Sequence, residues 1–389
     1  MSVEQELKLH IAAASRQAVE ELLHSAAAET IHLHALYFDT QDRALARAGI
    51  ALRLRKEADT WVQTIKLPGE DALSKIELNH LRPDATLDLS VYEGTPAEST
   101  FKRLNADLIV RFETDIQRTL STQSARHGTV ELAYDVGVIR SAALELPVYE
   151  LELELKSGAS AAIFELAESW QQDYQFILDF RSKAERGDAL ADLAIAQKAL
   201  SQQQTQDLDL GGAFEHFKLW QPAAIISSGN QSYTQTSEPQ LKKDSQQYLE
   251  LIARNAAVMA AIDRKDMATA IDLNCAAHLE ALCRALDQLH QLWSNAIAPN
   301  ATDKVDAAPA TSSLQAMRQT LSDYRQAFSA LSLAAPKAKH PSEPGIEQSA
   351  QNLYADLEPQ EAQQQANTLA ASSDFQQWLL KVLAWTILN

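Results

Sequence analysis

The first half of the chain alternates apolar and charged residues in short runs, whereas the second half repeats apolar residues at helical spacing. Alternation places every second side chain on the same face of a β-strand, so each run predicts a strand with one apolar face. Between the strands, apolar residues at helical spacing predict helices at 15–28 and 97–107. Pro68-Gly69 ends one strand, and Gly137 suits a turn between two others. The predicted strands are 4–9, 29–40, 49–56, 61–66, 75–81, 108–121, 129–136, 138–144 and 149–156.

Several of these strands carry a dense set of charges on one face. In the first strand, Glu4, Glu6 and Lys8 have the same parity. The last strand repeats this pattern with Glu150, Glu152, Glu154 and Lys156. The strands between them add Arg53 and Arg55; Thr64 and Lys66; Lys75, Glu77 and Asn79; Thr114 and Arg118; Glu131 and Asp135. Like charges this close repel each other, and burying them is costly without counter-ions.

The charged faces have two interpretations. Each face alone is consistent with a solvated face of an open sheet. Together they favour a sheet closed into a barrel, with the charged faces lining the interior and the apolar faces packed on flanking helices. An interior with acidic and basic walls suits a polyanion bound with divalent cations, because Arg and Lys contact phosphate oxygens and carboxylates hold Mg²⁺ or Mn²⁺.

An ordered series of motifs over the first 200 residues or so resembles the CYTH superfamily, the triphosphate tunnel metalloenzymes. In chain order the motifs are Glu4-x-Glu6-x-Lys8, Tyr37-Phe38-Asp39-Thr40, Gly49-Ile-Ala-Leu-Arg53-Leu-Arg55, Thr64-x-Lys66, Thr114-x-x-x-Arg118, the run from Glu150 to Lys156, and Ser182-Lys183-x-x-Arg186-Gly187. One position departs from the family pattern, because Asn79 stands where the family often has a second glutamate after Glu77. Asn79 cannot supply the charge of that glutamate.

The resemblance implies an α+β fold, in which an eight-stranded antiparallel β-barrel forms a tunnel with flanking helices. It also implies metal-dependent hydrolysis of inorganic triphosphate with one or two Mg²⁺ or Mn²⁺ ions. The implied metal ligands are Glu4, Glu6, Glu150, Glu152 and Glu154. The implied substrate ligands are Lys8, Arg53, Arg55, Lys66, Arg118, Lys183 and Arg186, and the catalytic set is Glu4, Glu6, Lys8 and Lys183. Further tunnel candidates are Lys75, Glu77, Glu131, Asp135 and Lys156.

Other functions could use the same site. Thiamine triphosphatase, nucleoside triphosphatase and class IV-type adenylate cyclase activities remain open, although the His-Phe that precedes the first motif in the cyclase branch is missing. A sensor that binds polyphosphate or a nucleotide without catalysis is an alternative of another class. The acidic sets on both the first and the last strand favour an enzyme, since an anion binder does not need so many carboxylates.

The second half predicts an all-α helical bundle domain over 213–389, separated from the barrel domain (1–200) by a polar linker at 201–212. The predicted helices are 241–265, 267–296, 312–333, 345–357 and 373–388. The stretch from His278 to Arg284 faintly resembles a CHAD domain, a polyphosphate-binding bundle. Residues 201–389 carry 13 Lys and Arg against 20 Asp and Glu, which does not support a polyphosphate groove. We therefore expect a degenerate CHAD-like bundle with buried His278 and His290, acting on a protein partner or within the chain.

Composition bears on the partners of the protein and on its location in the cell. The net charge of −18 over 389 residues argues against a nucleic-acid partner. No apolar run reaches the roughly 20 residues of a membrane span, and the N-terminus lacks a signal-peptide pattern. The two cysteines, Cys275 and Cys283, are about two helical turns apart and too distant for a disulfide within one helix. We expect a cytoplasmic protein.

Overall fold

The structure is a computed structural model that describes residues 2–25, 28–203, 237–260, 275–296, 309–334 and 359–388. The chain divides into two compact units. Within the described residues, the first unit comprises 2–167 and 179–203. The second comprises 168–178 and all the described segments from residue 237 onward.

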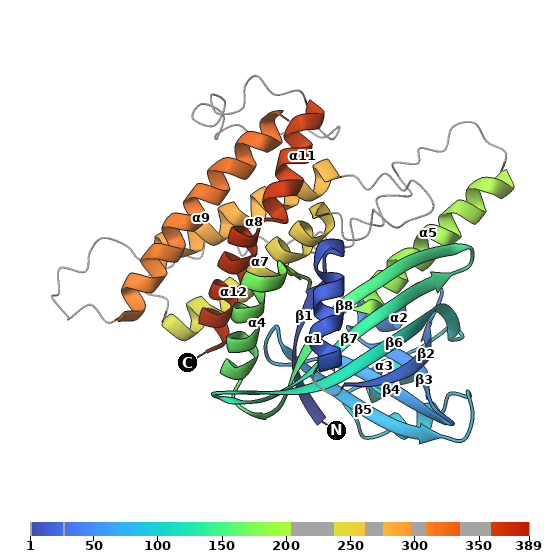
Figure 1. Cartoon of the computed structure of the whole chain (residues 1–389). Helices are drawn as coiled ribbons and strands as arrows, with labels where there is room; N and C mark the ends of the chain where they lie inside the picture. Colours follow the sequence, from blue (N-terminus) through green and yellow to red (C-terminus); the bar gives the residue numbers. More distant parts are fainter. Residues whose placement is uncertain are drawn as a thin grey trace. The chain divides into compact units, whose positions relative to one another are not determined.

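Eight antiparallel strands of the first unit close into a barrel (Figure 1). Their order is β5-β4-β3-β2-β6-β7-β8-β1, and β1 also pairs with β5, which closes the sheet. The strands are β1 (Ser2–His10), β2 (Glu29–Asp39), β3 (Ala51–Glu57), β4 (Thr60–Pro68), β5 (Ser74–Arg82), β6 (Ile109–Ala125), β7 (Gly128–Ser141) and β8 (Leu144–Gly158). The predicted eight-stranded antiparallel barrel is therefore confirmed.

Helices cover apolar positions on the outside of the barrel. The helical segments that begin in this unit are η1 (Ala13–Ser15), α1 (Arg16–Ser25), α2 (Ala44–Arg47), η2 (Leu89–Tyr92), α3 (Glu98–Lys102), α4 (Ala161–Tyr174) and α5 (Lys183–Gln203). Helix α5 packs against β6, β7 and β8. One buried cluster joins β3, β4 and β5 to the helical segments before and after them: Leu45, Ile50, Leu52, Ile65, Leu78, Tyr92 and Ala97. These contacts account for the apolar faces of these three strands.

The turn predicted at Gly137 is wrong. Gly137 lies inside β7, opposite Ile116 of β6, and a Cβ there would come within 2.1 Å of the Asp115 carbonyl oxygen. The glycine therefore marks a close approach of two strands and not a turn. The chain reverses at Ala142–Ala143, where Ala142 adopts a φ of 51°. The predicted strands 129–136 and 138–144 thus belong mainly to one strand.

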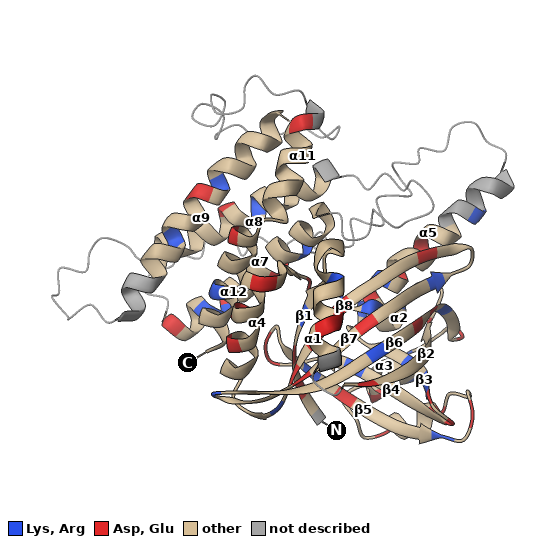
Figure 2. Cartoon of the chain, in the orientation of Figure 1, with Lys and Arg blue, Asp and Glu red and all other residues tan. Residues whose placement is uncertain are grey.

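The second unit consists mainly of helices. They are α7 (Glu238–Met259), α8 (Cys275–Ala296), α9 (Pro309–Ala334), α11 (Pro359–Ala370) and α12 (Ser373–Ile387), together with the short strand β9 (Ile177–Leu178). Aromatic rings of α9 and α12 pack against each other, with Tyr324 and Phe375 centroids 4.9 Å apart. Acidic and basic residues are scattered along these helices in Figure 2, in keeping with the absence of a basic excess in the sequence.

Four of the five predicted C-terminal helices are found in their described parts. The fifth, 345–357, lies outside the described residues. Helix α11 was missed because its apolar residues are mostly alanines among glutamines, although Ala362, Ala366 and Ala370 are buried at helical spacing. Helix α5 continues to Gln203, so it includes the first residues of the predicted linker, and the rest of that linker is not described. None of the described helices combines the length and the apolar character that crossing a membrane requires.

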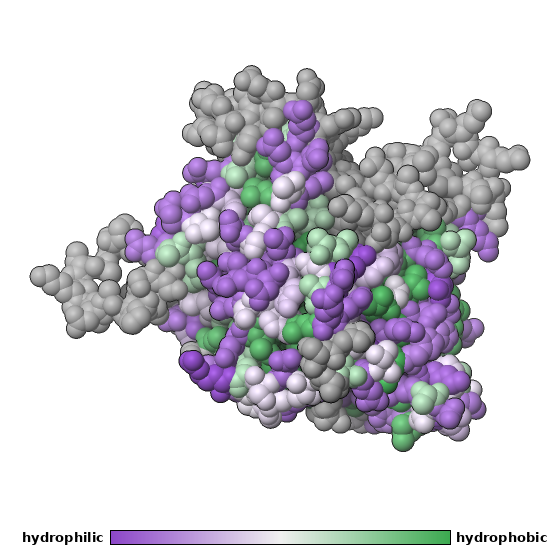
Figure 3. All heavy atoms as spheres, viewed as in Figure 1, coloured by the Kyte–Doolittle hydropathy of each residue, from purple (hydrophilic) through white to green (hydrophobic). Residues whose placement is uncertain are grey.

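The visible face of the molecule carries mostly hydrophilic residues (Figure 3). The hydrophobic residues among its coloured atoms form small, separate patches. Scattered patches of this kind are normal on a folded protein and do not by themselves mark a binding surface.

Candidate functional site

The inner face of the barrel collects charges because polar and apolar residues alternate along its strands. In β1, Leu7 and Leu9 are buried at 1% and 2% exposure, and Glu6 and Lys8 occupy the opposite face. Lys8 lies opposite Glu152 of β8 in the register of the sheet. The first and last predicted acidic strands are therefore neighbours, as a closed barrel requires.

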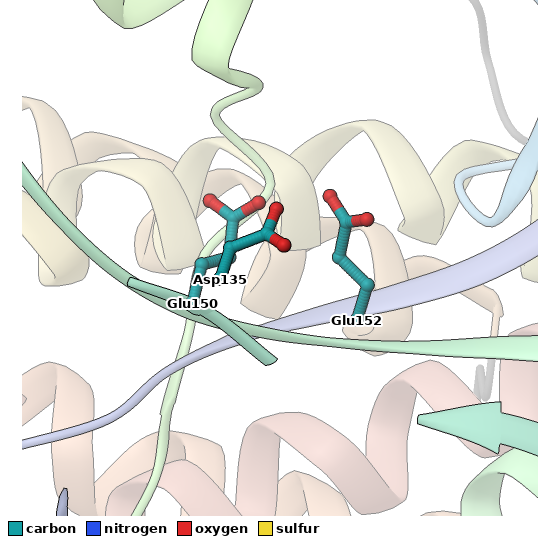
Figure 4. A group of neighbouring side chains, drawn as sticks. All are labelled: Asp135, Glu150 and Glu152. Atoms are coloured by element: carbon teal, nitrogen blue, oxygen red, sulfur yellow. The ribbon is translucent and has the colours of Figure 1, made fainter. Parts of the chain in front are cut away.

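Three carboxylates form what we call the acidic centre: Asp135 of β7, and Glu150 and Glu152 of β8. Asp135 and Glu150 are directly opposite in the register, and Glu152 follows on the same face of β8. One oxygen from each carboxylate lies within 4.8 Å of the others, and all three residues are buried. Figure 4 shows their carboxylates on the same side of the strands. Asp135 was predicted only as a further tunnel candidate and not as a metal ligand.

Cations surround the acidic centre, and Glu152 contacts three of them. It lies 2.6 Å from the Lys8 ammonium, 2.7 Å from the Arg118 guanidinium and 3.0 Å from the Lys183 ammonium. Arg118 also donates two hydrogen bonds to Asp135, at 2.6 and 2.7 Å. Lys183 contacts the remaining two carboxylates, that of Asp135 at 2.7 Å and that of Glu150. Residues from β1, β6 and α5 thus neutralise charge on β7 and β8.

The two glutamates of the centre have pKa values shifted in opposite directions. Burial raises the pKa of Glu150, and the negative charge of Glu152 adds to this, outweighing the attraction of Lys183 and Lys8. Burial also opposes ionisation of Glu152, but its three cationic partners prevail and hold its pKa well below the ordinary value. Two carboxyls of different proton affinity, side by side, are typical of sites that combine charge stabilisation with proton transfer.

The start of helix α5 places Lys183 at the acidic centre. The Ser182 hydroxyl accepts a hydrogen bond from the Glu185 amide at 3.1 Å, while the Ser182 amide donates to the Glu185 carboxylate at 2.8 Å. This reciprocal pair is a capping box, which fixes where the helix begins. One turn later, Arg186 donates to the Pro147 carbonyl at 3.0 Å and lies 3.6 Å from Glu150.

A second inner cluster joins β1 to β4 and β5. The Lys66 ammonium lies 3.1 Å from Glu4 and 2.8 Å from Glu77, and Arg53 is 3.7 Å from Glu77. Burial and a hydrogen bond shared with Glu77 raise the pKa of Glu4 to about 7 despite the charge of Lys66. Burial acts in the same sense on Glu77, but Lys66, the shared hydrogen bond and Arg53 lower its pKa to about 2. Glu6 lies 3.2 Å from Lys8, which contacts the acidic centre.

Two arginines of β3 provide further positive charge. Burial lowers the pKa of Arg55, and the positive charges of Arg53 and Arg118 lower it further. Arg53 also donates a hydrogen bond to the Tyr37 hydroxyl at 3.4 Å. Tyr37 stacks on Phe112 with ring centroids 4.5 Å apart. Tyr37 was part of a recognised motif but was given no role, although its parity with Arg53 in neighbouring strands could have indicated one.

Other predicted residues lie apart from the acidic centre. Lys156 is 2.9 Å from both Glu131 and Glu154, and the three form a separate, partly exposed group. Lys75 lies opposite Glu4 in the β1–β5 register. Asn79 accepts a hydrogen bond from the Thr64 hydroxyl at 2.6 Å, so it contributes an amide to the inner face where the family often has a carboxylate.

The acidic centre has the donor atoms that Mg²⁺ or Mn²⁺ prefers. It offers only carboxylate oxygens, the hard ligands that suit these ions, and its positions are already close enough to share one ion. The residues present therefore fit a divalent metal.

Comparisons with known proteins agree with this geometry. The sequence profile of the CYTH domain matches residues 2–187. The inorganic triphosphatase of Haemophilus influenzae is 30% identical over 166 residues, which cover 41% of this chain and 46% of that relative. The match therefore spans about half of the relative's length.

Two solved structures are similar to this chain over a comparable share. One is a proposed adenylyl cyclase from Hippeastrum, described as having a dominant triphosphatase activity; it is 17% identical, with 46% of this chain and 92% of that chain covered and a TM-score of 0.33. The other is a proposed adenylate cyclase from Bacillus halodurans, 20% identical, with 44% and 91% covered and a TM-score of 0.32. On the strength of the profile match, residues 2–187 of this chain form a CYTH domain.

Proposed function

We propose that the barrel hydrolyses inorganic triphosphate to diphosphate and phosphate, with Mg²⁺ or Mn²⁺ as cofactor. The observation that carries the proposal is the acidic centre, in which three buried carboxylates and three cations meet on the inner face. The similarity to an inorganic triphosphatase supports the same reaction. Carboxylates in this number would serve no purpose in a protein that only binds anions.

The basic residues of the barrel would bind the substrate. Arg53, Arg55 and Lys66 come from β3 and β4, and Lys8, Arg118, Lys183 and Arg186 approach from the side of the acidic centre. Guanidinium groups bind phosphate oxygens in pairs, and ammonium groups act as point charges, so the set would neutralise and orient a linear polyanion. Phosphoryl transfer depends mostly on such positioning and charge stabilisation.

The carboxylates would divide two further tasks. Glu152 and Asp135, whose pKa values are lowered by neighbouring cations despite burial, would stay ionised and would hold the metal together with Glu150. Glu4 and Glu6 on β1 are the other proposed ligands, whereas Glu154, also predicted as a ligand, pairs with Lys156 and is not part of the proposed set. A bound metal ion would neutralise the developing charge on the phosphate oxygens. One glutamate of the set would accept the proton of the attacking water as the bond to the leaving diphosphate breaks.

A substrate panel tests the proposal. Phosphate release by the full chain is measured with tripolyphosphate, ATP and thiamine triphosphate, each with Mg²⁺ or Mn²⁺. We expect tripolyphosphate to have the highest kcat/KM. Faster turnover of ATP or thiamine triphosphate would replace the proposed substrate within the same site. Binding of tripolyphosphate without turnover of any of the three would favour a sensor.

A further inference from the structure

Two histidines and two carboxylates face outward on neighbouring strands of the barrel, away from the acidic centre. His32 and His34 have the same parity on β2, and Glu113 and Asp115 share parity on β6. The inward residue between the histidines, Leu33, is 6% exposed. The four outward side chains are between 35% and 61% exposed. Solvent therefore reaches all four, and none of them belongs to the proposed triphosphate site.

Each imidazole lies against a carboxylate. His32 Nε2 is 2.6 Å from Asp115 Oδ1, and His34 Nε2 is 3.2 Å from Glu113 Oε2. In the strand register, Asp115 is directly opposite His34 although its carboxylate contacts His32. Side chains directly opposite in a sheet have Cβ atoms roughly 5 Å apart. Asp115 thus lies within reach of both histidines.

We propose that His32, His34 and Asp115, with Glu113 as a fourth ligand, bind a transition-metal dication of the Zn²⁺ class. Imidazole and carboxylate together suit Zn²⁺, Cu²⁺ or Ni²⁺, whereas Mg²⁺ prefers an all-oxygen site such as the acidic centre. A tetrahedral Zn²⁺ with bonds of about 2.0–2.2 Å holds its ligand atoms roughly 3.3 Å apart. The His34–Glu113 separation of 3.2 Å is already close to that value, whereas His32 and Asp115, at 2.6 Å, are hydrogen-bonded and would have to move apart to share the ion.

Binding requires the two His–carboxylate pairs to converge. Among the described residues, only the acidic centre already brings three ligand atoms within 4.8 Å. Exposed side chains rotate at small cost, so the outer ligands can turn toward one ion without moving the strands. The ion would link β2 to β6 from outside the barrel.

Arg140 of β7 competes with a metal ion for this site. Its guanidinium lies 3.0 Å from Asp115 and 2.7 Å from Glu145. A cation at that distance occupies a lone pair of Asp115 and repels a second cation. Removing this charge is therefore expected to strengthen metal binding, an outcome that a merely structural role of the histidines would not produce.

The chain supplies a matched control at another exposed histidine. His127 lies 3.2 Å from Glu165, with side-chain exposures of 49% and 39%. This pair has the same kind of contact as His34 with Glu113 but no second histidine two residues away. It reports what one exposed His–carboxylate pair contributes to metal binding.

The test is Zn²⁺ titration of the untagged full chain by calorimetry in excess Mg²⁺, which saturates all-oxygen sites. We expect the chain to bind one Zn²⁺ at this site. The affinity should fall at least about tenfold in His34→Gln, and binding should be lost in the double variant His32→Gln/His34→Gln. The affinity should be unchanged in His127→Gln and should rise in Arg140→Gln. Co²⁺ in place of Zn²⁺ should give a visible absorption band that disappears in the double variant. The proposal fails if the double variant keeps this ion, or if His127→Gln weakens it as much as His34→Gln. Tripolyphosphate hydrolysis, measured on the same variants, reports separately on the barrel interior.

Discussion

Replacement of Glu152 by Gln removes one charge from the acidic centre while keeping the shape of the side chain. In the wild-type protein this carboxylate contacts Lys8, Arg118 and Lys183, all within 3.0 Å. The side chains of these four residues are 10–20% exposed, so the contacts are largely shielded from water. The three cations would then share the remaining carboxylates of Asp135 and Glu150.

The expected losses follow from this arrangement. Removing one partner of a buried ion pair costs about 3–5 kcal/mol of unfolding free energy, and we expect the lower end because the cations keep two carboxylates. Loss of a group that stabilises charge in a transition state lowers kcat by about 10²–10³-fold. Glu154→Gln, two residues along the same face, should cost less than about 1 kcal/mol of stability because Glu154 pairs with the 40%-exposed Lys156.

The assay compares both variants by tripolyphosphate hydrolysis across a range of Mg²⁺ concentrations and by denaturant unfolding. Glu152→Gln should need more Mg²⁺ for half-maximal rate and keep a reduced kcat at saturation. Glu154→Gln should lose much less activity than Glu152→Gln. Equal losses in the two variants, or a fully active Glu152→Gln, would refute the assignment of the metal site to the acidic centre.

Two other predictions address the support of the site and the second unit. Burial raises the pKa of Asp188 to about 6 despite the charges of Arg43 and Arg111. The folded state therefore holds this proton more tightly than the unfolded state, and stability falls as pH rises from about 4 to 6. Asp188→Asn should gain about 2 kcal/mol relative to wild type between pH 4 and 7 in denaturant unfolding; a pH-independent difference would contradict this. Separately, residues 1–200 alone should keep triphosphatase activity, and a folded but inactive fragment would show that the helical unit contributes to catalysis.

The barrel could be predicted from the sequence because alternation survives in every strand. Closure was inferred from the charged faces, which would be costly on separate sheets, and the pairing of β1 with both β5 and β8 confirms it. The β7–β8 hairpin could not be placed, because its turn at Ala142–Ala143 contains no Gly, Asn or Pro. The turn was predicted at Gly137 instead, although a glycine is needed there because a side chain would collide with the backbone of β6.

With that misplaced turn, the sequence did not place Asp135 next to the acidic strand β8. A reversal at Ala142–Ala143 puts Asp135 directly opposite Glu150, whereas a turn at Gly137 removes it from the acidic strand. The contacts of Lys183 could not be predicted for another reason. Its place in a motif was recognised, but only the capping box at Ser182 and the packing of α5 on the barrel bring it to three carboxylates.

The second half was predictable where large apolar residues recur at helical spacing. Helices α7, α8, α9 and α12 contain such residues, whereas the buried face of α11 is made of alanines and does not stand out among its glutamines. His278 is buried as predicted and lies 2.9 Å from the Asn255 side-chain oxygen. His290 is only partly buried, with its Nδ1 2.9 Å from Arg325. The likeness to a CHAD domain stays a prediction.

The central claim is that the barrel interior hydrolyses triphosphate with the help of a divalent metal. The most direct measurement is phosphate release from tripolyphosphate by the full chain, before and after EDTA, with Mg²⁺ or Mn²⁺ then restored. We predict that EDTA abolishes release and that the added metal recovers it in wild type but leaves Glu6→Gln slower by orders of magnitude. Turnover that persists in EDTA, or a Glu6→Gln variant as active as wild type, would contradict the claim.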